Sequence, residues 1–181
     1  MKTRLDLLDS LPKFSKGAEL GVFAGDFSRE ILTRIQPSQF FMVDLFDGEV
    51  ESGDVNGQNF RTVDMELQQG VLEKEFAALI QQGVVSIEKE NAWEWLSNLG
   101  DSTLDWAYID CSHKYQPTVR ELEASWSAVK HGGFICGHDY HAGWFPDVVQ
   151  AVGEFCDKHG LTKELTTEDG LASYRIHLLK S

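Results

Sequence analysis

The sequence has few cysteines, no long apolar run and little positive charge, and each absence excludes a class of protein. Its three cysteines, Cys111, Cys136 and Cys156, form no even set that would indicate a disulfide framework. No apolar stretch approaches the roughly 20 residues that a membrane-spanning helix needs. The N-terminus has no secretory apolar region, so the sequence predicts a protein of the reducing cytoplasm without a membrane partner.

Basic residues are scarce relative to acidic ones. The 181 residues include 16 Lys and Arg against 29 Asp and Glu, which gives a formal net charge of −13. A field of this sign repels polyanions and slows their approach to the protein. The composition therefore argues against DNA or RNA as partners.

The chain does contain a regular alternation of helical and strand patterns with short connections. This alternation predicts a single α/β domain over residues 1–181, with a Rossmann-like doubly wound sheet of about seven strands and helices on both faces. Strands are expected at 18–22, 40–44, 84–88, 104–109 and 134–137, followed by an antiparallel C-terminal hairpin at 161–166 and 171–178. Helical patterns occupy 2–12, 27–35, 61–82, 93–99, 119–129 and 148–158.

The first strand pattern breaks into a turn that contains Gly21 and Gly25 and then enters a helix. Glycine permits backbone angles and close approaches that a Cβ would prevent, so a ligand can lie against the main chain at a helix N-terminus. Asp44 ends the next strand pattern, 19 residues after Gly25. An open parallel sheet usually offers a carboxylate to ribose hydroxyls at that place. Together these features predict a site for a cofactor that contains adenosine.

The glycine spacing differs from the dinucleotide fingerprint. Gly-x-x-x-Gly stands where Gly-x-Gly-x-x-Gly is expected, which argues against a pyrophosphate cradle. Two structural alternatives remain open at this point. The glycines of the turn would serve only tight packing between strand and helix, and Asp44 would only cap a strand end at the surface.

Polar side chains also follow the fourth and fifth strand patterns, at residues 110–115 and 137–140. Both strand ends open on the same edge of a doubly wound sheet as the glycine turn. If these strands are neighbours, about 4.8 Å apart, Asp110 and Asp139 are close enough to share one cation, and Mg²⁺ suits an oxygen-rich site. A histidine that titrates near neutrality, His113, can accept a hydroxyl proton beside such an ion.

The same residues have plainer interpretations. Two aspartates are common turn formers without a metal, and His113 at a helix entry needs no chemistry. The pairs Cys111-x-His113 and Cys136-x-His138 are also compatible with a zinc site, which is a further alternative.

Residues 19–25, Glu-Leu-Gly-Val-Phe-Ala-Gly, resemble motif I of the class I S-adenosylmethionine-dependent methyltransferases, Glu-x-Gly-x-x-x-Gly. Five parallel strands followed by a hairpin also match the sheet of that family, so the resemblance covers nearly the whole chain. It implies S-adenosylmethionine as the cofactor, with Glu19 near its amino group and with Glu90 and Asn91 at the adenine. The cofactor site implied by the resemblance comprises Glu19, Gly21, Phe23, Gly25, Asp44, Glu90, Asn91 and Asp110.

A second resemblance narrows the family. Asp110-x-x-His113-x-Tyr115, then Gly132-Gly133, then His138-Asp139-Tyr140, is similar to the metal-dependent small-molecule O-methyltransferases, especially the macrocin-type sugar enzymes. It implies that Asp110 and Asp139 are metal ligands, with His138 as the third, and that His113 is the catalytic base. In catechol O-methyltransferase an Asp-Asn pair matches His138-Asp139. This chain therefore differs from that enzyme at the third metal ligand, and the difference bears on the identity of the metal.

The expected activity is therefore methyl transfer from S-adenosylmethionine to a hydroxyl of a small molecule, with Mg²⁺ at the site. The alternatives are an oxidoreductase that binds a nicotinamide dinucleotide at the same turn and a catalytically inactive cofactor-fold binding module. The acidic, glycine-rich stretch 46–60 is expected to be a mobile loop, either a lid or plain solvated chain. Trp144, in a glycine-flanked loop, is the expected substrate-binding tryptophan, and no pattern indicates the acceptor or the oligomeric state.

Overall fold

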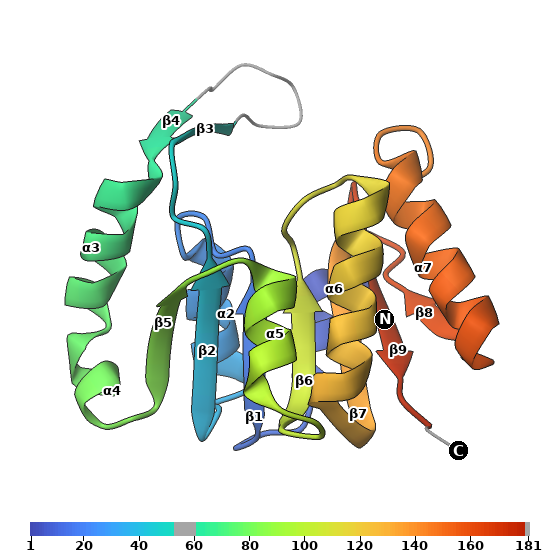
Figure 1. Cartoon of the computed structure of the whole chain (residues 1–181), viewed down its shortest axis with the longest axis horizontal. Helices are drawn as coiled ribbons and strands as arrows, with labels where there is room; N and C mark the ends of the chain where they lie inside the picture. The colour runs from blue at the N-terminus through green and yellow to red at the C-terminus, as the bar shows by residue number, and fades with distance from the viewer. Residues whose placement is uncertain (53–60, 180–181) are drawn as a thin grey trace.

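The computed structural model describes residues 1–52 and 61–179, and the side chains of residues 51, 52 and 61 lie outside the description. Its centre is a seven-stranded sheet in the order β5-β2-β1-β6-β7-β9-β8 (Figure 1). The first five strands of this order are parallel, and β9 and β8 run antiparallel to their neighbours. The sheet strands are β1 Lys16–Leu20, β2 Gln39–Asp44, β5 Val85–Lys89, β6 Leu104–Ile109, β7 Val129–Tyr140, β8 Lys163–Leu165 and β9 Ala172–His177.

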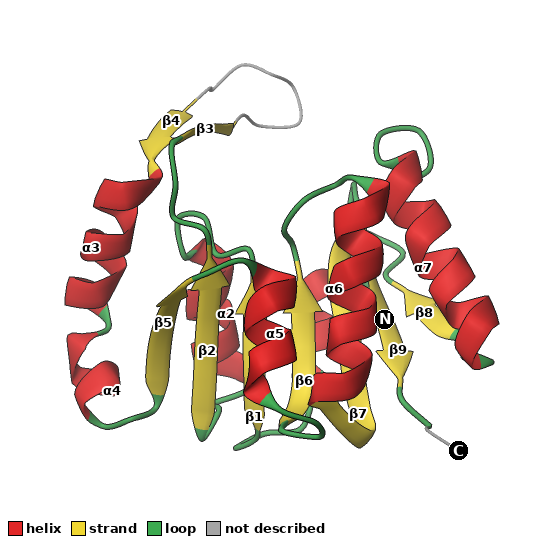
Figure 2. Ribbon diagram, viewed as in Figure 1, coloured by secondary structure: helices red, strands yellow, loops and turns green. Residues whose placement is uncertain are grey.

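Helices cover both faces of the sheet (Figure 2). One face packs α5 (Ala92–Leu99), α6 (Tyr115–Ala128) and α7 (Pro146–His159), and the other packs α1 (Arg4–Asp9), α2 (Asp26–Arg34), α3 (Met65–Glu75) and α4 (Ala77–Gln81). Strands β3 (Glu49–Ser52) and β4 (Arg61–Asp64) form a separate antiparallel pair. In Figure 1 this pair stands above the carboxyl end of β2.

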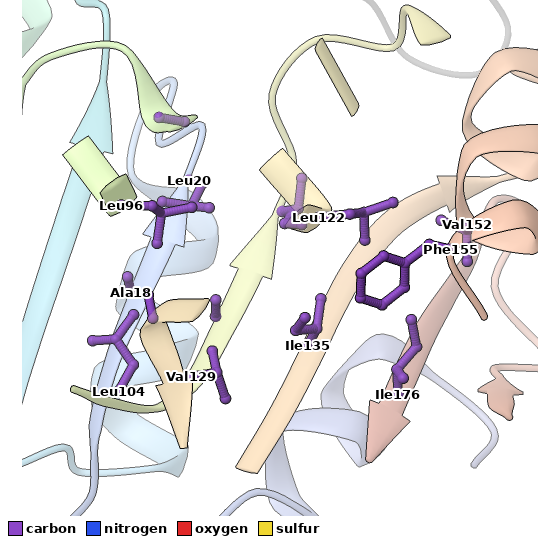
Figure 3. Packing of buried hydrophobic residues seen from close by; sticks show 14 of the residues in the cluster. Ala18, Leu20, Leu96, Leu104, Leu122, Val129, Ile135, Val152, Phe155 and Ile176 are labelled. Carbon is purple, nitrogen blue, oxygen red and sulfur yellow. The ribbon is translucent and has the colours of Figure 1, made fainter. Parts of the chain in front are cut away.

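Two apolar clusters correspond to the two faces. In the first, Leu96 of α5, Leu122 of α6 and Phe155 of α7 point at inward-facing residues of the sheet such as Ile135 (Figure 3). These side chains are buried, and burial of each large apolar side chain contributes about 1.5–3 kcal/mol. The parallel strands are apolar along almost their whole length because helices cover them on both sides.

The predicted α/β doubly wound sheet of seven strands with a C-terminal antiparallel pair is confirmed. Several boundaries differ. The first helix spans Arg4–Asp9 and not the expected 2–12. It starts at Arg4 because Thr3 and Asp6 form a reciprocal capping box there. Strand β1 ends at Leu20 because Gly21 takes φ +91° and turns the chain.

Strand β7 is much longer than the expected 134–137. Gly132-Gly133 lies inside it instead of ending the preceding helix, which stops at Ala128. Gly132 has φ +78°, and a Cβ on Gly133 would lie 2.6 Å from the backbone oxygen of Asp105. The glycines therefore carry β7 past an irregularity in its pairing with β6, where the register shifts between Leu104 and Trp106.

The prediction of a loop over 46–60 is wrong for Glu49–Ser52, which forms strand β3. Residues 53–60 of that prediction lie outside the described residues. The prediction of one helix over 61–82 is only partly right. Arg61–Asp64 forms strand β4, and the rest of this stretch forms two helices, α3 and α4. Within the described part of the chain, no helix has both the length and the apolar character to cross a membrane.

Candidate active site

A cavity of about 1140 Å³ opens at the carboxyl edge of the parallel strands. The turn after β1, the end of β2, the loop into α5 and the residues after β6 form its wall, and the N-terminal helix α1 adds residues from one side. Ligands of doubly wound sheets bind at this edge because the loops after the strands converge there. Every cofactor residue expected from the sequence except Gly25 lines this cavity: Glu19, Gly21, Phe23, Asp44, Glu90, Asn91 and Asp110.

Gly21 is required by a close approach of two strands. Its amide donates to the carbonyl of Val43 at 2.8 Å, while the amide of Asp110 donates to the carbonyl of Leu20 at 2.7 Å. A Cβ on Gly21 would lie 2.1 Å from the backbone oxygen of Asp110, and φ is +91°. The turn is thus held directly against the end of β6. Gly25, at φ +77°, is the N-cap residue before α2, and Phe23 between the two glycines has φ +50°.

Asp44 braces the turn from the neighbouring strand. One of its carboxylate oxygens accepts hydrogen bonds from the amides of Val22, at 2.7 Å, and Phe23, at 3.0 Å. The other accepts from the amide of Phe46 at 3.0 Å. Each carboxylate oxygen has two lone pairs, so the oxygen bonded to Phe46 retains acceptor capacity toward the cavity. Asp44 therefore fixes the turn while it lines the space expected for the ribose.

Glu19 is a buried acid beneath the turn. It is 1% exposed and accepts a short hydrogen bond from the Ser28 hydroxyl. Burial raises the pKa of Glu19 to about 8; Ser28 opposes this rise, Asp110 adds to it and Arg4 opposes it. The carboxyl group of Glu19 is therefore mostly protonated at neutral pH in the ligand-free protein. A cationic ligand placed beside it would favour the charged form.

The opposite end of the cavity lies at the loop after β5. Asn91 caps α5 by accepting from the amide of Trp93 at 3.2 Å, and the amide of Glu90 donates to the carbonyl of Asp44 at 3.1 Å. Trp93 also lines the cavity, next to Ala92. An indole beside a carboxylate and an amide suits a flat heteroaromatic ligand that carries an amino group.

Asp110, at the end of β6, has contacts on two sides. The Arg4 guanidinium lies 3.2 Å from its Oδ2, and His138 Nδ1 lies 4.0 Å from its Oδ1. Burial raises the pKa of Asp110, while His138 and Arg4 oppose that rise. Asp110 thus lines the cofactor cavity and also lies near His138 of the neighbouring strand β7.

His113 and Asp139 form the closest ionisable pair of this edge. His113 Nε2 lies 2.5 Å from Asp139 Oδ2, and the His113 ring packs against Phe145 at 4.4 Å between centroids. The hydrogen bond to Asp139 raises the pKa of His113. Burial acts to raise the pKa of Asp139, but the hydrogen bonds with His113 and His138 outweigh it and hold that pKa well below its usual range.

Asp139 is also conformationally unusual, with φ +59°. Non-glycine residues in this region cost about 1–3 kcal/mol and persist where the surroundings require them. Here His113 on one side and His138 Nδ1, 3.1 Å from Asp139 Oδ1, on the other fix the carboxylate.

One group of described residues has the donor atoms for a metal ion within 4.8 Å of one another: Asp110, His113 and Asp139. Two of these are the ligands expected from the sequence. The third is His113, expected as the base, and not His138, although His138 lies beside both carboxylates. Two carboxylates and one imidazole fit a divalent cation, and the imidazole extends the fit from Mg²⁺ to Mn²⁺, Fe²⁺ and Zn²⁺.

Other residues of the cavity were not expected from the sequence. Arg4, Trp93, Glu121 and Asp169 line it, whereas the exposed Trp144 is not among the lining residues. Burial raises the pKa of Glu121 to about 7. Arg4, Glu121 and Asp169 reach the cavity through tertiary packing and belong to no local motif. Trp93 was recognisable, since it lies two residues after Asn91 in the adenine-side loop.

A family model described as a methyltransferase domain matches residues 18–140, from the middle of β1 to the end of β7. The chain belongs to the methyltransferase domain family. No curated protein sequence matches it. The family and the fold together are those of S-adenosylmethionine-dependent methyltransferases, which makes the cavity over Gly21 the expected place of the cofactor.

Solved structures share this fold at low sequence identity. A Clostridium thermocellum protein assigned as an rRNA methylase is 12% identical, with a TM-score of 0.68, over 98% of this chain and 95% of its own. A precorrin-6y C5,15-methyltransferase from Geobacter metallireducens is 14% identical, with a TM-score of 0.65, over 96% of this chain and 85% of its own. An S-adenosylmethionine-dependent O-methyltransferase from Thermotoga maritima is 11% identical, with a TM-score of 0.63, over 98% of this chain and 64% of its own. At such identities the likeness concerns the fold, and the acceptor has to be argued from the site.

Proposed function

We propose that this methyltransferase transfers the methyl group of S-adenosylmethionine to a hydroxyl of a small molecule, with His113 as the general base. The observation that carries the proposal is the 2.5 Å contact between His113 Nε2 and Asp139 Oδ2 at the edge of the cofactor cavity. A sulfonium is already activated for displacement. The protein therefore mainly has to align an oxygen with the methyl carbon and take the hydroxyl proton.

The residues of the site divide this work. Asp139 orients the imidazole of His113, and the Phe145 ring packs against that imidazole and restricts its position. Asp110 lines the cofactor cavity together with His113, and its carboxylate lies within 4.8 Å of the donor atoms of His113 and Asp139. A neutral His113 accepts the proton of the acceptor hydroxyl, and Asp139 stabilises the imidazolium that results.

The proposal includes a divalent cation held by Asp110 and Asp139. Such an ion, when bound, acts as a Lewis acid that lowers the pKa of a coordinated hydroxyl. His138 is the third ligand implied by the family resemblance, and His113 is the third donor of the converging group. A His113 that binds the ion through Nε2 would not be the base. The metal test below therefore also assigns the role of His113.

A small acceptor agrees with the charge of the cavity. Its described lining contains nine acidic side chains and a single arginine, and a phosphate backbone would be repelled from such a wall. The acidic lining therefore favours neutral or cationic acceptors over nucleic acid, although structural neighbours include an rRNA methylase.

The test of the reaction is incubation with an isotopically labelled methyl donor and mixed hydroxylated metabolites, followed by mass spectrometry of the products. We expect label on an oxygen of a small molecule. Label on RNA or on nitrogen alone would contradict the proposal. Calorimetry with S-adenosylhomocysteine and NADH accompanies it, and tight binding of NADH alone would indicate the oxidoreductase instead. Cofactor binding without any methylated product would indicate an inactive module.

The test of the metal is calorimetric titration of Mg²⁺ and Mn²⁺ into the wild-type protein and the His113→Ala and His138→Ala variants. If His138 is the ligand, only His138→Ala weakens metal binding and His113 remains the base. Loss of binding in His113→Ala alone would reassign His113 as a ligand. Absence of any metal binding would remove the cation from the proposal and leave the His113–Asp139 pair as the whole catalytic apparatus.

A further inference from the structure

One side chain in the acidic wall of the cavity carries a positive charge, the guanidinium of Arg4. Among the described residues that line the cavity it is the single Lys or Arg side chain. The acidic lining residues are Glu19, Asp26, Glu30, Asp44, Asp47, Glu90, Asp110, Glu121 and Asp169. Any anionic part of a ligand in this space therefore has one cationic side chain available, apart from a protonated His113.

Arg4 is held in place by its own segment. The helix α1 is fixed at its start by the capping box of Thr3 and Asp6, and the backbone oxygen of Lys2 accepts from the amides of Thr167, at 3.1 Å, and Glu168, at 2.8 Å. The guanidinium itself lies 3.8 Å from the centroid of the Phe27 ring, where a cation–π contact restricts it further. The position of Arg4 is therefore defined before a ligand enters.

The hydrogen-bonding capacity of Arg4 is only partly used. Its Nη2 lies 3.2 Å from Asp110 Oδ2, but its Nε is buried without a hydrogen-bond partner in the described structure. A buried donor without a partner is unfavourable, so a ligand that supplies an acceptor gains from it. A guanidinium presents five donors in a planar fork that matches the two oxygens of a carboxylate. Arg4 thus combines a net positive charge, an unsatisfied donor and a fixed place in the cavity wall.

Arg4 also lies at a particular end of the cavity. Its Nη2 lies 3.2 Å from Oδ2 of Asp110, which follows β6, whereas Glu90 and Asn91 follow β5, and β2 and β1 stand between β5 and β6 in the sheet. The backbone amides of Val22 and Phe23, which would otherwise be available to an anion at the glycine turn, already donate to Asp44. The anion-binding capacity near Glu19 and Asp110 therefore lies mainly in Arg4.

We infer that Arg4 binds the carboxylate of the methionine part of S-adenosylmethionine and thereby selects a methyl donor that carries its amino-acid group. This inference rests on the proposed use of S-adenosylmethionine and goes beyond it. The donor has one anionic group, the carboxylate, beside two cationic groups, the ammonium and the sulfonium. Glu19 and Asp110 favour the ammonium, and Arg4 next to them favours the carboxylate. The N-terminal helix is thus part of the cofactor site.

The experiment compares two ligands that differ in this carboxylate alone, S-adenosylmethionine and decarboxylated S-adenosylmethionine, by calorimetry. The wild-type protein is expected to prefer S-adenosylmethionine by roughly 10- to 100-fold, the range of a charge-assisted hydrogen-bonded pair. In Arg4→Gln that preference should be lost, mainly through weaker binding of S-adenosylmethionine. Arg4→Lys, which keeps the charge without the fork, should retain part of it and serves as the second variant if Arg4→Gln unfolds.

Lys2→Gln is the matched control. It removes one positive charge two residues earlier in the same segment, where Lys2 is 73% exposed and pairs with Glu168. The ligand preference of this variant should equal that of the wild type. Equal weakening of both ligands in Arg4→Gln would show a structural role of Arg4, and an unchanged preference would show no role; either result overturns the inference while the proposed function stands. Failure of the wild-type protein to bind S-adenosylmethionine would overturn both.

Discussion

The two halves of the site are built in different ways. The proposed cofactor half is built around the backbone, since main-chain hydrogen bonds join the ends of β1, β2 and β6, and the Asp44 carboxylate accepts from the amides of the turn. The proposed reacting half is made of ionisable side chains, since Asp110 and His113, which follow β6, meet Asp139, which lies 26 residues after His113 in β7. A site made of backbone should lose ligand binding when a substitution alters the main-chain geometry. A site made of ionisable side chains should lose activity when a substitution removes a charge or a proton acceptor. The predictions below test this contrast.

The largest effect is expected for His113→Ala. Removal of a general base typically costs about 10²- to 10⁴-fold in turnover. The affinity for S-adenosylhomocysteine, measured by calorimetry, should stay within about twofold, because the proposed base acts on the acceptor hydroxyl and not on the cofactor. His131→Ala, an exposed histidine of β7, is the control and should leave both quantities unchanged. Equal turnover of the two variants would show that His113 is structural.

Gly21→Ala should damage the cofactor half. The new Cβ would meet the backbone of Asp110, and the alanine would be forced to φ +91°. We expect a loss of roughly 3 kcal/mol in the free energy of unfolding, together with loss of S-adenosylhomocysteine binding. Gly83→Ala is the matched control because Gly83 has φ +72° but nothing within 4 Å of its Cβ position. Similar losses in the two variants, in denaturant titrations, would mean that the contact with β6 is unimportant.

The contrast also explains what the sequence revealed. Glu19, Gly21 and Asp44 were predictable because a backbone site leaves a local signature, a glycine spacing and an acid at a strand end. Arg4 had no such signature, since its place depends on how α1 packs against β6. The extent of β7 was missed because Gly132-Gly133 normally ends a helix, and only the pairing with β6 shows that it carries a strand past an irregularity.

Asp44→Ala should have an intermediate effect. It leaves the amides of Val22, Phe23 and Phe46 without their acceptor. Unpaired amides at the edge of a cavity are partly rehydrated, so we expect about 1–3 kcal/mol of lost stability and weaker cofactor binding. Asp47→Ala, which removes another acid from the cavity wall, should change thermal stability by no more than about 0.5 kcal/mol. Indistinguishable melting temperatures would show that the carboxylate does not brace the turn.

The last prediction concerns the pH dependence of stability. The pKa of Glu19 is raised from 4.5 to about 8 by burial, so between these values the folded protein keeps a proton that the unfolded chain has released. Stability should therefore fall as pH rises from about 5 to 8, because the folded state binds a proton that the unfolded state has lost. Glu19→Gln, which mimics the protonated acid, should flatten this slope in urea titrations. An unchanged slope would contradict the assignment; Glu121, with a pKa raised to about 7, would supply any remaining part.

The most direct test of the account is a crystal structure with S-adenosylhomocysteine bound. The central claim is that adenosyl binding and methyl transfer occur side by side at the carboxyl edge of one sheet. The account predicts the adenosine between Asp44 and Asn91 and the sulfur atom beside Asp110, facing His113. A ligand elsewhere on the molecule, or a sulfur atom turned away from the His113–Asp139 pair, would contradict it.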